Sequence, residues 1–216
     1  EEDVRETLEG TFLEDAEIVK VSSITGSGFD QLEEHLNTLV EKVSPREANG
    51  IFRMPVQRVF SPKGFGTVVT GIPVSGTAQL GDTLEIVPLG EKGRVRGIQA
   101  YKEQAETARA GHSAAINLSD IDYRQVSRGM VLTQPGYFTG STMFEARLHY
   151  LPDNHRVLKH QTTIRLHVGT AELIGKVYLL EGKILEPGQE GYVQFRFEEP
   201  VVAAPGDRYV LRLHSP

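Results

Sequence analysis

Apolar and polar residues alternate along most of the chain from Ile51 onward. Residues 144–150, 164–168, 192–197 and 209–213 each place an apolar side chain at every second position. Because a strand presents successive side chains to opposite faces, this period predicts half-buried β-strands. Short turn signals separate the predicted strands, for example Gly81-Asp82, Pro187-Gly188 and Pro205-Gly206. We therefore predict a mainly β fold of antiparallel barrels, in which closure removes the exposed strand edges.

The predicted β region is too long for one small barrel, since about 165 residues follow Ile51. Residues 133–140 read Thr-Gln-Pro-Gly-Tyr-Phe-Thr-Gly and are rich in turn formers. We place the division there, with one barrel over residues 53–136 and a second over residues 141–216.

The first 43 residues follow a different pattern, which indicates helix, strand and helix. Residues 17–21 alternate like a strand, and residues 29–43 place apolar side chains at helical spacing. Ser27, followed by Asp30, is the expected N-cap of this helix. The segment is too short to be a domain, so we expect it to be one edge of a larger α/β sheet. Residues 44–52 have the proline, glycine and polar residues of a linker.

Net charge is distributed unevenly between these parts. Residues 1–43 hold 12 acidic and 3 basic residues, a net charge of −9, whereas the rest of the chain has a net charge of +3. A mildly basic β region can support contacts with phosphates, and an acidic segment repels them. A solvated helix face explains the acidic segment equally well.

The chain lacks the motifs of conventional enzyme sites. It has no cysteine, which excludes disulfides and thiolate chemistry, and no G-x-S-x-G or H-E-x-x-H sequence. His155 and His160 are five residues apart, which suits neither a helix face nor a strand face, so we predict no metal site. Neither a signal peptide nor an apolar run of membrane-spanning length is present, which favours a cytoplasmic protein. We predict no catalytic residue in this chain.

Residues 64–71 read Gly-Phe-Gly-Thr-Val-Val-Thr-Gly and form the most distinctive stretch. Two closely spaced glycines permit a tight turn or the close approach of a ligand. The stretch is not a phosphate loop, because strand-like residues follow it rather than a helix that begins with Lys-Ser or Lys-Thr. Taken alone, it predicts a β-hairpin.

With its flanks, this hairpin resembles the second domain of translational GTPases. The flanks are residues 55–61 (Pro-Val-Gln-Arg-Val-Phe-Ser), residues 76–82 and residues 128–132 (Arg-Gly-Met-Val-Leu). Residues 158–172 and 198–208 are similar to the third domain of the selenocysteine-specific elongation factors. The turn at Val21–Gly26 resembles the last guanine-binding motif of these GTPases. The resemblance covers essentially the whole chain.

The resemblance implies that a preceding GTPase domain of the parent protein binds GTP and Mg²⁺. Its P-loop, switch regions and N-K-x-D motif do not occur in this sequence. Only the guanine-contacting turn would remain, with Ser22, Ser23 and Ile24. We therefore expect this fragment to be an inactive remnant of a GTPase that holds no cofactor of its own.

The resemblance also implies that the first barrel holds the end of an aminoacylated tRNA. By position, the terminal adenosine pocket corresponds to Gly66, Thr67, Gln99 and Lys102. In the family, an arginine preceded by an acidic residue faces the selenolate of selenocysteine, and here these positions hold Arg58 and Gln57. A second arginine of the family matches Ser113, so His112 is the candidate that replaces it.

The second barrel of the family contacts the tRNA backbone, and its candidates are exposed polar-face residues of the predicted strands. They are Arg147, His149, Arg165, His167 and Arg196. The implied partners are selenocysteyl-tRNA and the ribosome. Binding of an mRNA hairpin would need further domains beyond Pro216, and no membrane partner is expected.

Three other functions remain compatible with the sequence. The fold also suits a metabolic GTPase subunit of the sulfate adenylyltransferase type, or a translational GTPase without selenocysteine specificity. Alternatively, the barrels bind only protein partners, because a net charge of +3 is small for a nucleic-acid-binding surface.

Overall fold

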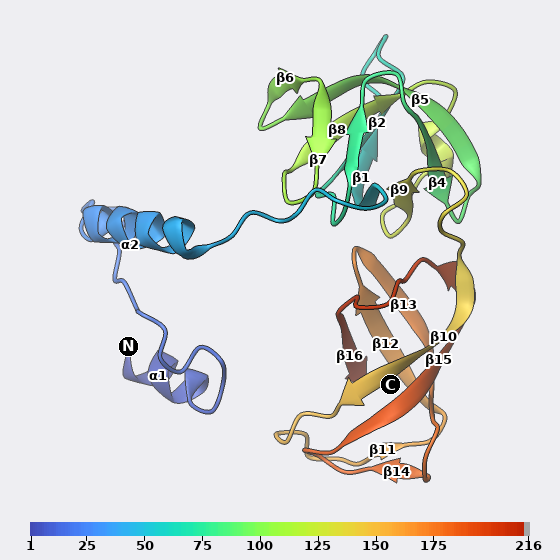
Figure 1. Cartoon of the computed structure of the whole chain (residues 1–216). Coiled ribbons are helices and arrows are strands. Elements are labelled where there is room, and N and C mark those ends of the chain that lie inside the picture. The colour runs from blue at the N-terminus through green and yellow to red at the C-terminus, as the bar shows by residue number, and fades with distance from the viewer. Residues whose placement is uncertain (214–216) are drawn as a thin grey trace. The chain divides into compact units, whose positions relative to one another are not determined.

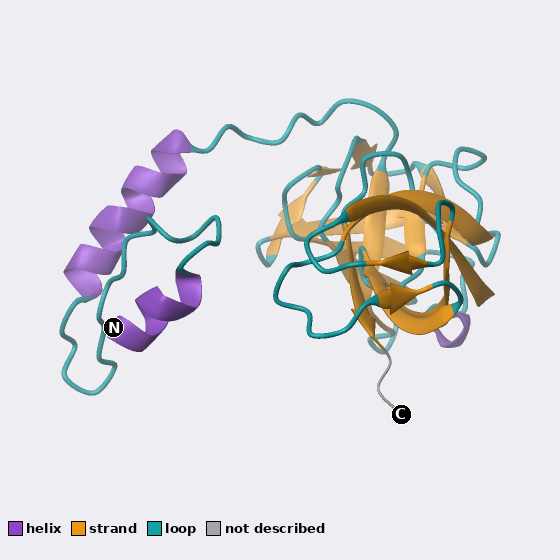
Figure 2. Ribbon diagram, turned by 90° about the horizontal axis from the view of Figure 1, so that it is seen from below, coloured by secondary structure: helices purple, strands orange, loops and turns teal. Residues whose placement is uncertain are grey.

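A computed structural model describes residues 1–213 (Figure 1). The chain consists of two compact units, Glu1–Pro45 and Arg46–Pro216. Unit one contains helices α1 (Glu2–Leu8) and α2 (Phe29–Lys42). Strands make up the body of unit two, as Figure 2 shows. None of the described helices is long and apolar enough to cross a membrane.

Two expectations for unit one are wrong. Residues 17–21 form no strand, because the described part of this unit offers no second strand to pair with them. The N-cap of α2 is Gly28 with φ of 81°, not Ser27. A Cβ at Gly28 would lie 2.0 Å from the Lys20 carbonyl oxygen, so this close approach requires glycine. Ser27 instead contacts Thr25 through their hydroxyl groups at 3.1 Å.

The predicted helical spacing in residues 29–43 is confirmed, but its apolar stripe is exposed. No residue of α2 is buried, and Leu36 and Leu39 keep about half of their surface in solvent. The stripe therefore has no covering partner within unit one.

The first sheet closes into a six-stranded antiparallel barrel. Its hydrogen-bonded order is β4-β9-β1-β2-β8-β5, and β5 pairs back with β4, while β6 extends from β5. The strands are β1 (Arg53–Phe60), β2 (Thr67–Gly71), β3 (Thr77–Gln79), β4 (Thr83–Val87), β5 (Glu91–Ala100), β6 (Glu103–Ala105), β7 (Thr107–Arg109), β8 (Ala114–Leu118) and β9 (Val131–Thr133). A separate β3–β7 ribbon and the 3-10 helix η1 (Tyr123–Gln125) complete this part. The inward side chains form one core around Phe52, Met54 and Ile116, each fully buried.

The second sheet is antiparallel but remains open. Its order is β10-β15-β13-β12-β16, and a β11–β14 ribbon lies outside it. The strands are β10 (Ser141–His149), β11 (Leu158–Lys159), β12 (Thr162–Val168), β13 (Ala171–Leu179), β14 (Ile184–Leu185), β15 (Glu190–Val201) and β16 (Tyr209–Leu213). The predicted strands are confirmed, whereas the predicted closure is not. In the described residues β10 and β16 stay edges, bridged by a 2.6 Å hydrogen bond from the Tyr209 hydroxyl to the Arg147 carbonyl.

The inner face of the second sheet is rich in aromatic rings. Phe195 is fully buried, and it lies 5.4 Å from Phe144 and 5.3 Å from Tyr209 between ring centroids. Burial raises the pKa of Tyr209 to about 12. This half-barrel therefore has a core of its own, distinct from that of the first barrel.

A small apolar cluster joins the two sheets. Val87 and Val131 of the first barrel pack with Val202, which directly follows β15, and Phe138 packs against them. The first sheet ends at Thr133 and the second begins at Ser141, within the stretch where the sequence predicts a division. The domain boundaries themselves stay a prediction, since the compact units divide the chain after Pro45.

Candidate nucleic-acid interface

Strand register places several of the predicted residues on one outer row of the closed barrel. Arg58 of β1 lies opposite Thr70 of β2, Thr70 lies opposite Ala115 of β8, and Ala115 lies opposite Gln99 of β5. Arg58 and Gln99 are both exposed. Three inter-strand spacings separate them, halfway around the six-stranded barrel, so the path between them along the outer surface is roughly 14 Å.

A β-bulge in β1 explains why two successive residues face outward. Val56 pairs with Gly71, whereas Arg58 pairs with Thr70, so Gln57 is the extra residue. Simple alternation would turn either Gln57 or Arg58 toward the core. The bulge exposes both, beside the fully buried Val56.

Next to Gln99 the same face is hollowed. The hollow has a volume of about 340 Å³, and its lining includes Phe60, Phe65, Gly97, Gln99, Gln104 and Asn117. The Asn117 side-chain amide donates a 2.7 Å hydrogen bond to the Phe65 carbonyl and so holds the β1–β2 loop over the hollow. An exposed aromatic ring beside amide side chains offers a base both a stacking surface and hydrogen-bond partners.

The other predicted adenosine contacts do not line this hollow. Gly66 has φ of 78° and lies in the loop beside Phe65. Lys102 is exposed with φ of 70° in the β5–β6 turn, next to Tyr101. Thr67 points into the barrel, with 2% of its surface exposed, and its hydroxyl donates a 2.5 Å hydrogen bond to the Ile121 carbonyl.

We expect Thr67→Val to lower the free energy of unfolding by about 1 to 2 kcal/mol, because it removes the hydroxyl and leaves the Ile121 carbonyl unpaired. Urea denaturation followed by circular dichroism measures this change. Thr70→Val, on the outer face, is the matched control and should change stability by less than about 0.5 kcal/mol. Equal losses in the two variants would show that the buried hydrogen bond contributes nothing.

The His112 side chain contacts both Arg109 and Tyr101. Its Nε2 accepts a 2.9 Å hydrogen bond from the Arg109 guanidinium, and its ring meets Tyr101 edge-on at 5.5 Å. The Arg109 guanidinium therefore places a cation directly beside the His112 ring. Arg109 was not among the predicted residues, because only the fold of the β7–β8 loop brings it to His112.

The predicted backbone contacts of the second sheet form two similar clusters. Arg147 and His149 share Glu190, with His149 Nδ1 3.2 Å from the carboxylate. Arg165 pairs with Glu172, and His167 Nδ1 lies farther from that carboxylate, at 3.9 Å. The hydrogen bond from Arg147 is the main cause that lowers the pKa of Glu190. These four side chains therefore have acidic partners, which reduces their attraction for phosphate.

Arg196 differs, because it has no acidic partner within salt-bridge distance in residues 1–213. Its guanidinium lies 4.1 Å from the centre of the Tyr178 ring and donates a 2.7 Å hydrogen bond to Gln194. The His160 ring packs edge-on against the same Tyr178 ring, with 5.4 Å between the ring centroids. No group of three potential metal-ligating side chains occurs within the described part of the chain.

The predicted guanine-contacting residues form an exposed turn in unit one. The Gly26 N–H donates to the Ser22 carbonyl at 2.8 Å, and the Ser22 N–H donates to Ser27 at 3.0 Å. Ile24 is 96% exposed. The turn thus presents Ser23 and Ile24 to the outside.

Comparison with known proteins agrees with these features. Residues 66–133 match the family described as elongation factor Tu domain 2, and residues 145–215 match the β-barrel domain of the selenocysteine-specific elongation factor. The selenocysteine-specific elongation factor of Desulfomicrobium baculatum is 40% identical over 100% of this chain and 34% of its own length. That of Escherichia coli (strain K12) is 31% identical over 98% of this chain and 32% of its own length. The chain thus spans about a third of the length of these relatives.

Two crystal structures have the same fold. A bacterial selenocysteine-specific elongation factor, EF-Sec, is 26% identical with a TM-score of 0.82, over 98% of this chain and 34% of that protein. The elongation factor SelB from Methanococcus maripaludis, in its apo form, is 27% identical with a TM-score of 0.82, over 100% of this chain and 51% of that protein. The closed barrel followed by a second antiparallel sheet is therefore that of the translation elongation factors. Within this class, the chain belongs to the family of the selenocysteine-specific elongation factors.

Proposed function

We propose that this chain is the tRNA-holding part of an elongation factor that delivers selenocysteyl-tRNA to the ribosome in a GTP-dependent manner. The observation that carries the proposal is the outer row that runs from Arg58 to Gln99, together with the hollow beside Gln99, whose lining also includes Phe60 of the strand that carries Arg58. Similarity over the whole chain to selenocysteine-specific elongation factors supports it. The cytoplasm is the expected location.

In this proposal the hollow takes the terminal adenosine, which stacks on Phe65 and bonds to the amide of Gln99. The attached amino acid extends along the row toward Arg58, over a surface path of roughly 14 Å. A selenol ionises more readily than a thiol or an alcohol. Within the described part of unit two, no carboxylate lies within salt-bridge distance of Arg58. Its guanidinium then favours selenocysteine over serine by a charge-assisted contact.

The remaining roles follow from the same proposal. GTP and Mg²⁺ would be held by a nucleotide-binding domain of the parent protein, with Ser22, Ser23 and Ile24 near the guanine. In the second sheet, Arg196 is the best candidate for a contact with the tRNA backbone, because its charge is not neutralised by a carboxylate.

Arg58→Ala in the full-length protein is expected to reduce the preference for selenocysteyl-tRNA over seryl-tRNA by about tenfold or more, since one charge-assisted contact is lost. Binding of seryl-tRNA should change little, because its hydroxyl is neutral. Equilibrium binding of both aminoacyl-tRNAs and of uncharged tRNA measures this effect.

Arg124→Ala serves as the control, because Arg124 is exposed on the same barrel but pairs with Asp122 away from the row. If Arg58→Ala leaves the preference intact, Arg58 does not recognise the selenolate. If wild type binds charged and uncharged tRNA equally, the tRNA-end proposal fails, and a metabolic GTPase or a protein-interaction module becomes the better explanation.

A further inference from the structure

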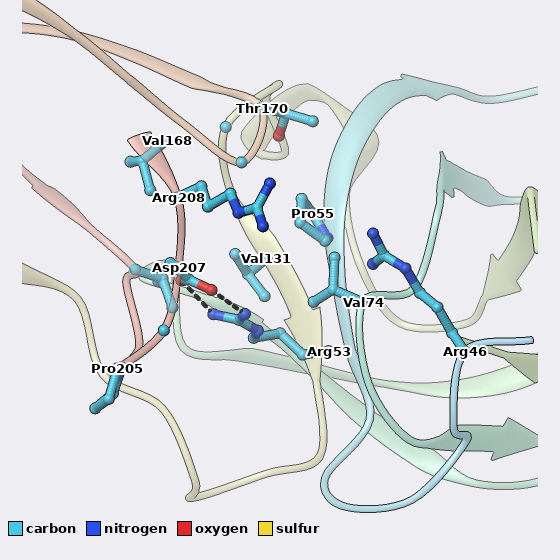
Figure 3. A pocket seen from close by; sticks show the side chains of 14 residues that line it. Arg46, Arg53, Pro55, Val74, Val131, Val168, Thr170, Pro205, Asp207 and Arg208 are labelled. Atoms are coloured by element: carbon cyan, nitrogen blue, oxygen red, sulfur yellow. Dashed lines mark hydrogen bonds and ion pairs between the residues drawn. The ribbon is translucent and has the colours of Figure 1, made fainter. Parts of the chain in front are cut away.

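The segment that leads from unit one into the closed barrel is fixed at both of its ends. At the start of the segment, the Arg46 side chain packs on Gly111, where an added Cβ would lie 3.5 Å from the Arg46 Cβ. At its end, Arg53 donates to both carboxylate oxygens of Asp207, as the dashed lines in Figure 3 show. Both arginines are labelled in that view. The length of backbone between them is therefore set by the fold.

The middle of this segment is hydrogen-bonded to the barrel. The Gly76 N–H donates a 3.0 Å hydrogen bond to the Asn49 carbonyl. The Ser75 hydroxyl donates a 2.6 Å hydrogen bond to the Ile51 carbonyl. Phe52 follows directly and is fully buried in the barrel core. A change in the backbone at residue 49 or 50 therefore acts on residues that have fixed places in the fold.

Asn49 is the only one of the four asparagines in the chain that is followed by glycine. The backbone nitrogen after an asparagine can attack the side-chain Cγ, because this attack closes a five-membered ring. Glycine at the next position leaves the approach open, since it has no Cβ. Gly50 is exposed, and nothing lies within 4 Å of the position that its Cβ would take. The surroundings thus leave room for the ring.

The hydrogen bonds around this peptide group favour the attack. The Asn49 carbonyl and the Gly50 N–H belong to the same peptide group, so the bond that Gly76 donates to the carbonyl polarises the N–H and makes its proton easier to remove. The Gly50 N–H makes no hydrogen bond of its own within residues 1–213. The Asn49 side-chain amide donates one long hydrogen bond, to Glu47 at 3.3 Å.

The other three asparagines are held more firmly. The Asn117 amide donates a 2.7 Å hydrogen bond to the Phe65 carbonyl, and the Asn154 amide donates a 2.8 Å hydrogen bond to the Leu151 carbonyl. Asn37 lies inside α2. Each of them is also followed by a residue with a Cβ. These sites therefore provide internal comparisons within the same chain.

We infer that Asn49 is a site of spontaneous deamidation, at which the backbone rearranges to isoaspartate. The Gly50 nitrogen gives up its proton and attacks Asn49 Cγ, a C–N bond forms, and Nδ2 takes up a proton and leaves as ammonia. Water then adds to one carbonyl of the cyclic imide, and one C–N bond of the ring breaks. Opening at the backbone carbonyl carbon of Asn49 gives isoaspartate, and opening at Cγ gives aspartate. Either product replaces a neutral amide by a carboxylate.

Isoaspartate adds one carbon atom to the backbone path inside a segment that is anchored at both ends. The longer path displaces Ile51 and Phe52 relative to Ser75 and Gly76. Urea denaturation should therefore show a lower midpoint for the converted protein than for the fresh protein, and an unchanged midpoint would overturn this consequence. The inference does not depend on the proposed function, because it uses only the chemistry of this peptide group.

Incubation of the 216-residue chain in mildly alkaline buffer at physiological temperature tests the inference. Trypsin, which cleaves after arginine, releases residues 47–53 as a peptide in which Asn49 is the only asparagine. Mass spectrometry should show progressive deamidation of this peptide, and an isoaspartate-specific methyltransferase should label it. The peptides that contain Asn37, Asn117 and Asn154 should react at least about tenfold more slowly, because a Cβ follows each of them. A sample digested without incubation corrects for reaction during the digest.

Two variants test the ring. Gly50→Ala should slow the conversion about tenfold, because its Cβ hinders the approach of the nitrogen. Gly50 has φ of 83°, so alanine there is strained, and Asn49→Gln provides a second variant without this strain. Glutamine would have to close a six-membered ring, and conversion should be lost. Conversion at Asn49 no faster than at Asn154, or unchanged conversion in Gly50→Ala, would overturn the inference. Loss of the amide without isoaspartate would indicate direct hydrolysis and would overturn it as well.

Discussion

Gly76→Ala is expected to lower the free energy of unfolding by about 3 to 5 kcal/mol, enough to unfold a marginally stable barrel. Gly76 has φ of 66°, and a Cβ there would lie 2.4 Å from the Phe52 nitrogen and 2.6 Å from the Phe52 Cα. Phe52 is fully buried in the barrel core, and its backbone cannot move away. The substitution therefore adds a backbone clash to a left-handed conformation. Urea denaturation, followed by circular dichroism, measures the loss.

Gly90→Ala separates the two contributions. Gly90 has φ of 81° in the β4–β5 turn, but a Cβ there would meet nothing within 4 Å. This variant should lose only about 1 to 2 kcal/mol, the cost of the left-handed conformation by itself. If both variants lose the same free energy, the close approach of residue 76 to Phe52 does not constrain the fold.

Much of the fold could be predicted because alternation is a local property of the sequence. The strands over residues 144–150, 164–168 and 209–213 follow directly from side chains that lie two residues apart. Closure is not local. Whether β10 meets β16 depends on strand number and on tilt, which no single run of residues encodes. The strand predicted over residues 17–21 does not form for a related reason, because a strand needs a second strand to pair with and the local sequence does not supply one.

The candidate site shows the same limit. The positions of Arg58 and Gln99 follow from the barrel, and both are exposed on one row. The inward turn of Thr67 depends on strand register instead. The sharing of Glu190 by Arg147 and His149 also depends on which strands pair across the sheet. Arg53 and Asp207 lie 154 residues apart, so no sequence pattern connects them.

Asp207→Ala is expected to lower the free energy of unfolding by about 2 to 4 kcal/mol. The side chains of Asp207 and Arg53 are only 23% and 13% exposed, so removal of the carboxylate leaves a guanidinium largely buried without its partner. The Ala204 N–H also loses its acceptor. Replacement of both partners by apolar residues, in Arg53→Met with Asp207→Leu, should recover much of the loss. Denaturation in urea at neutral pH measures all three proteins.

Glu190→Ala is the matched control, because its pair with Arg147 is exposed to solvent and should contribute much less to stability. The pH dependence provides a second test. The pKa of Asp207 in the folded protein lies below the usual 3.8, because hydrogen bonds from Arg53 and Ala204 outweigh burial. Ionised Asp207 therefore stabilises the fold fully above about pH 4, and this contribution is lost as the pH falls through the lowered pKa. The stability difference between wild type and Asp207→Asn should shrink over that range. Two results would contradict this role of the carboxylate. One is a stability difference between wild type and Asp207→Asn that stays constant down to pH 2. The other is a loss of unfolding free energy in Asp207→Ala no larger than that in Glu190→Ala.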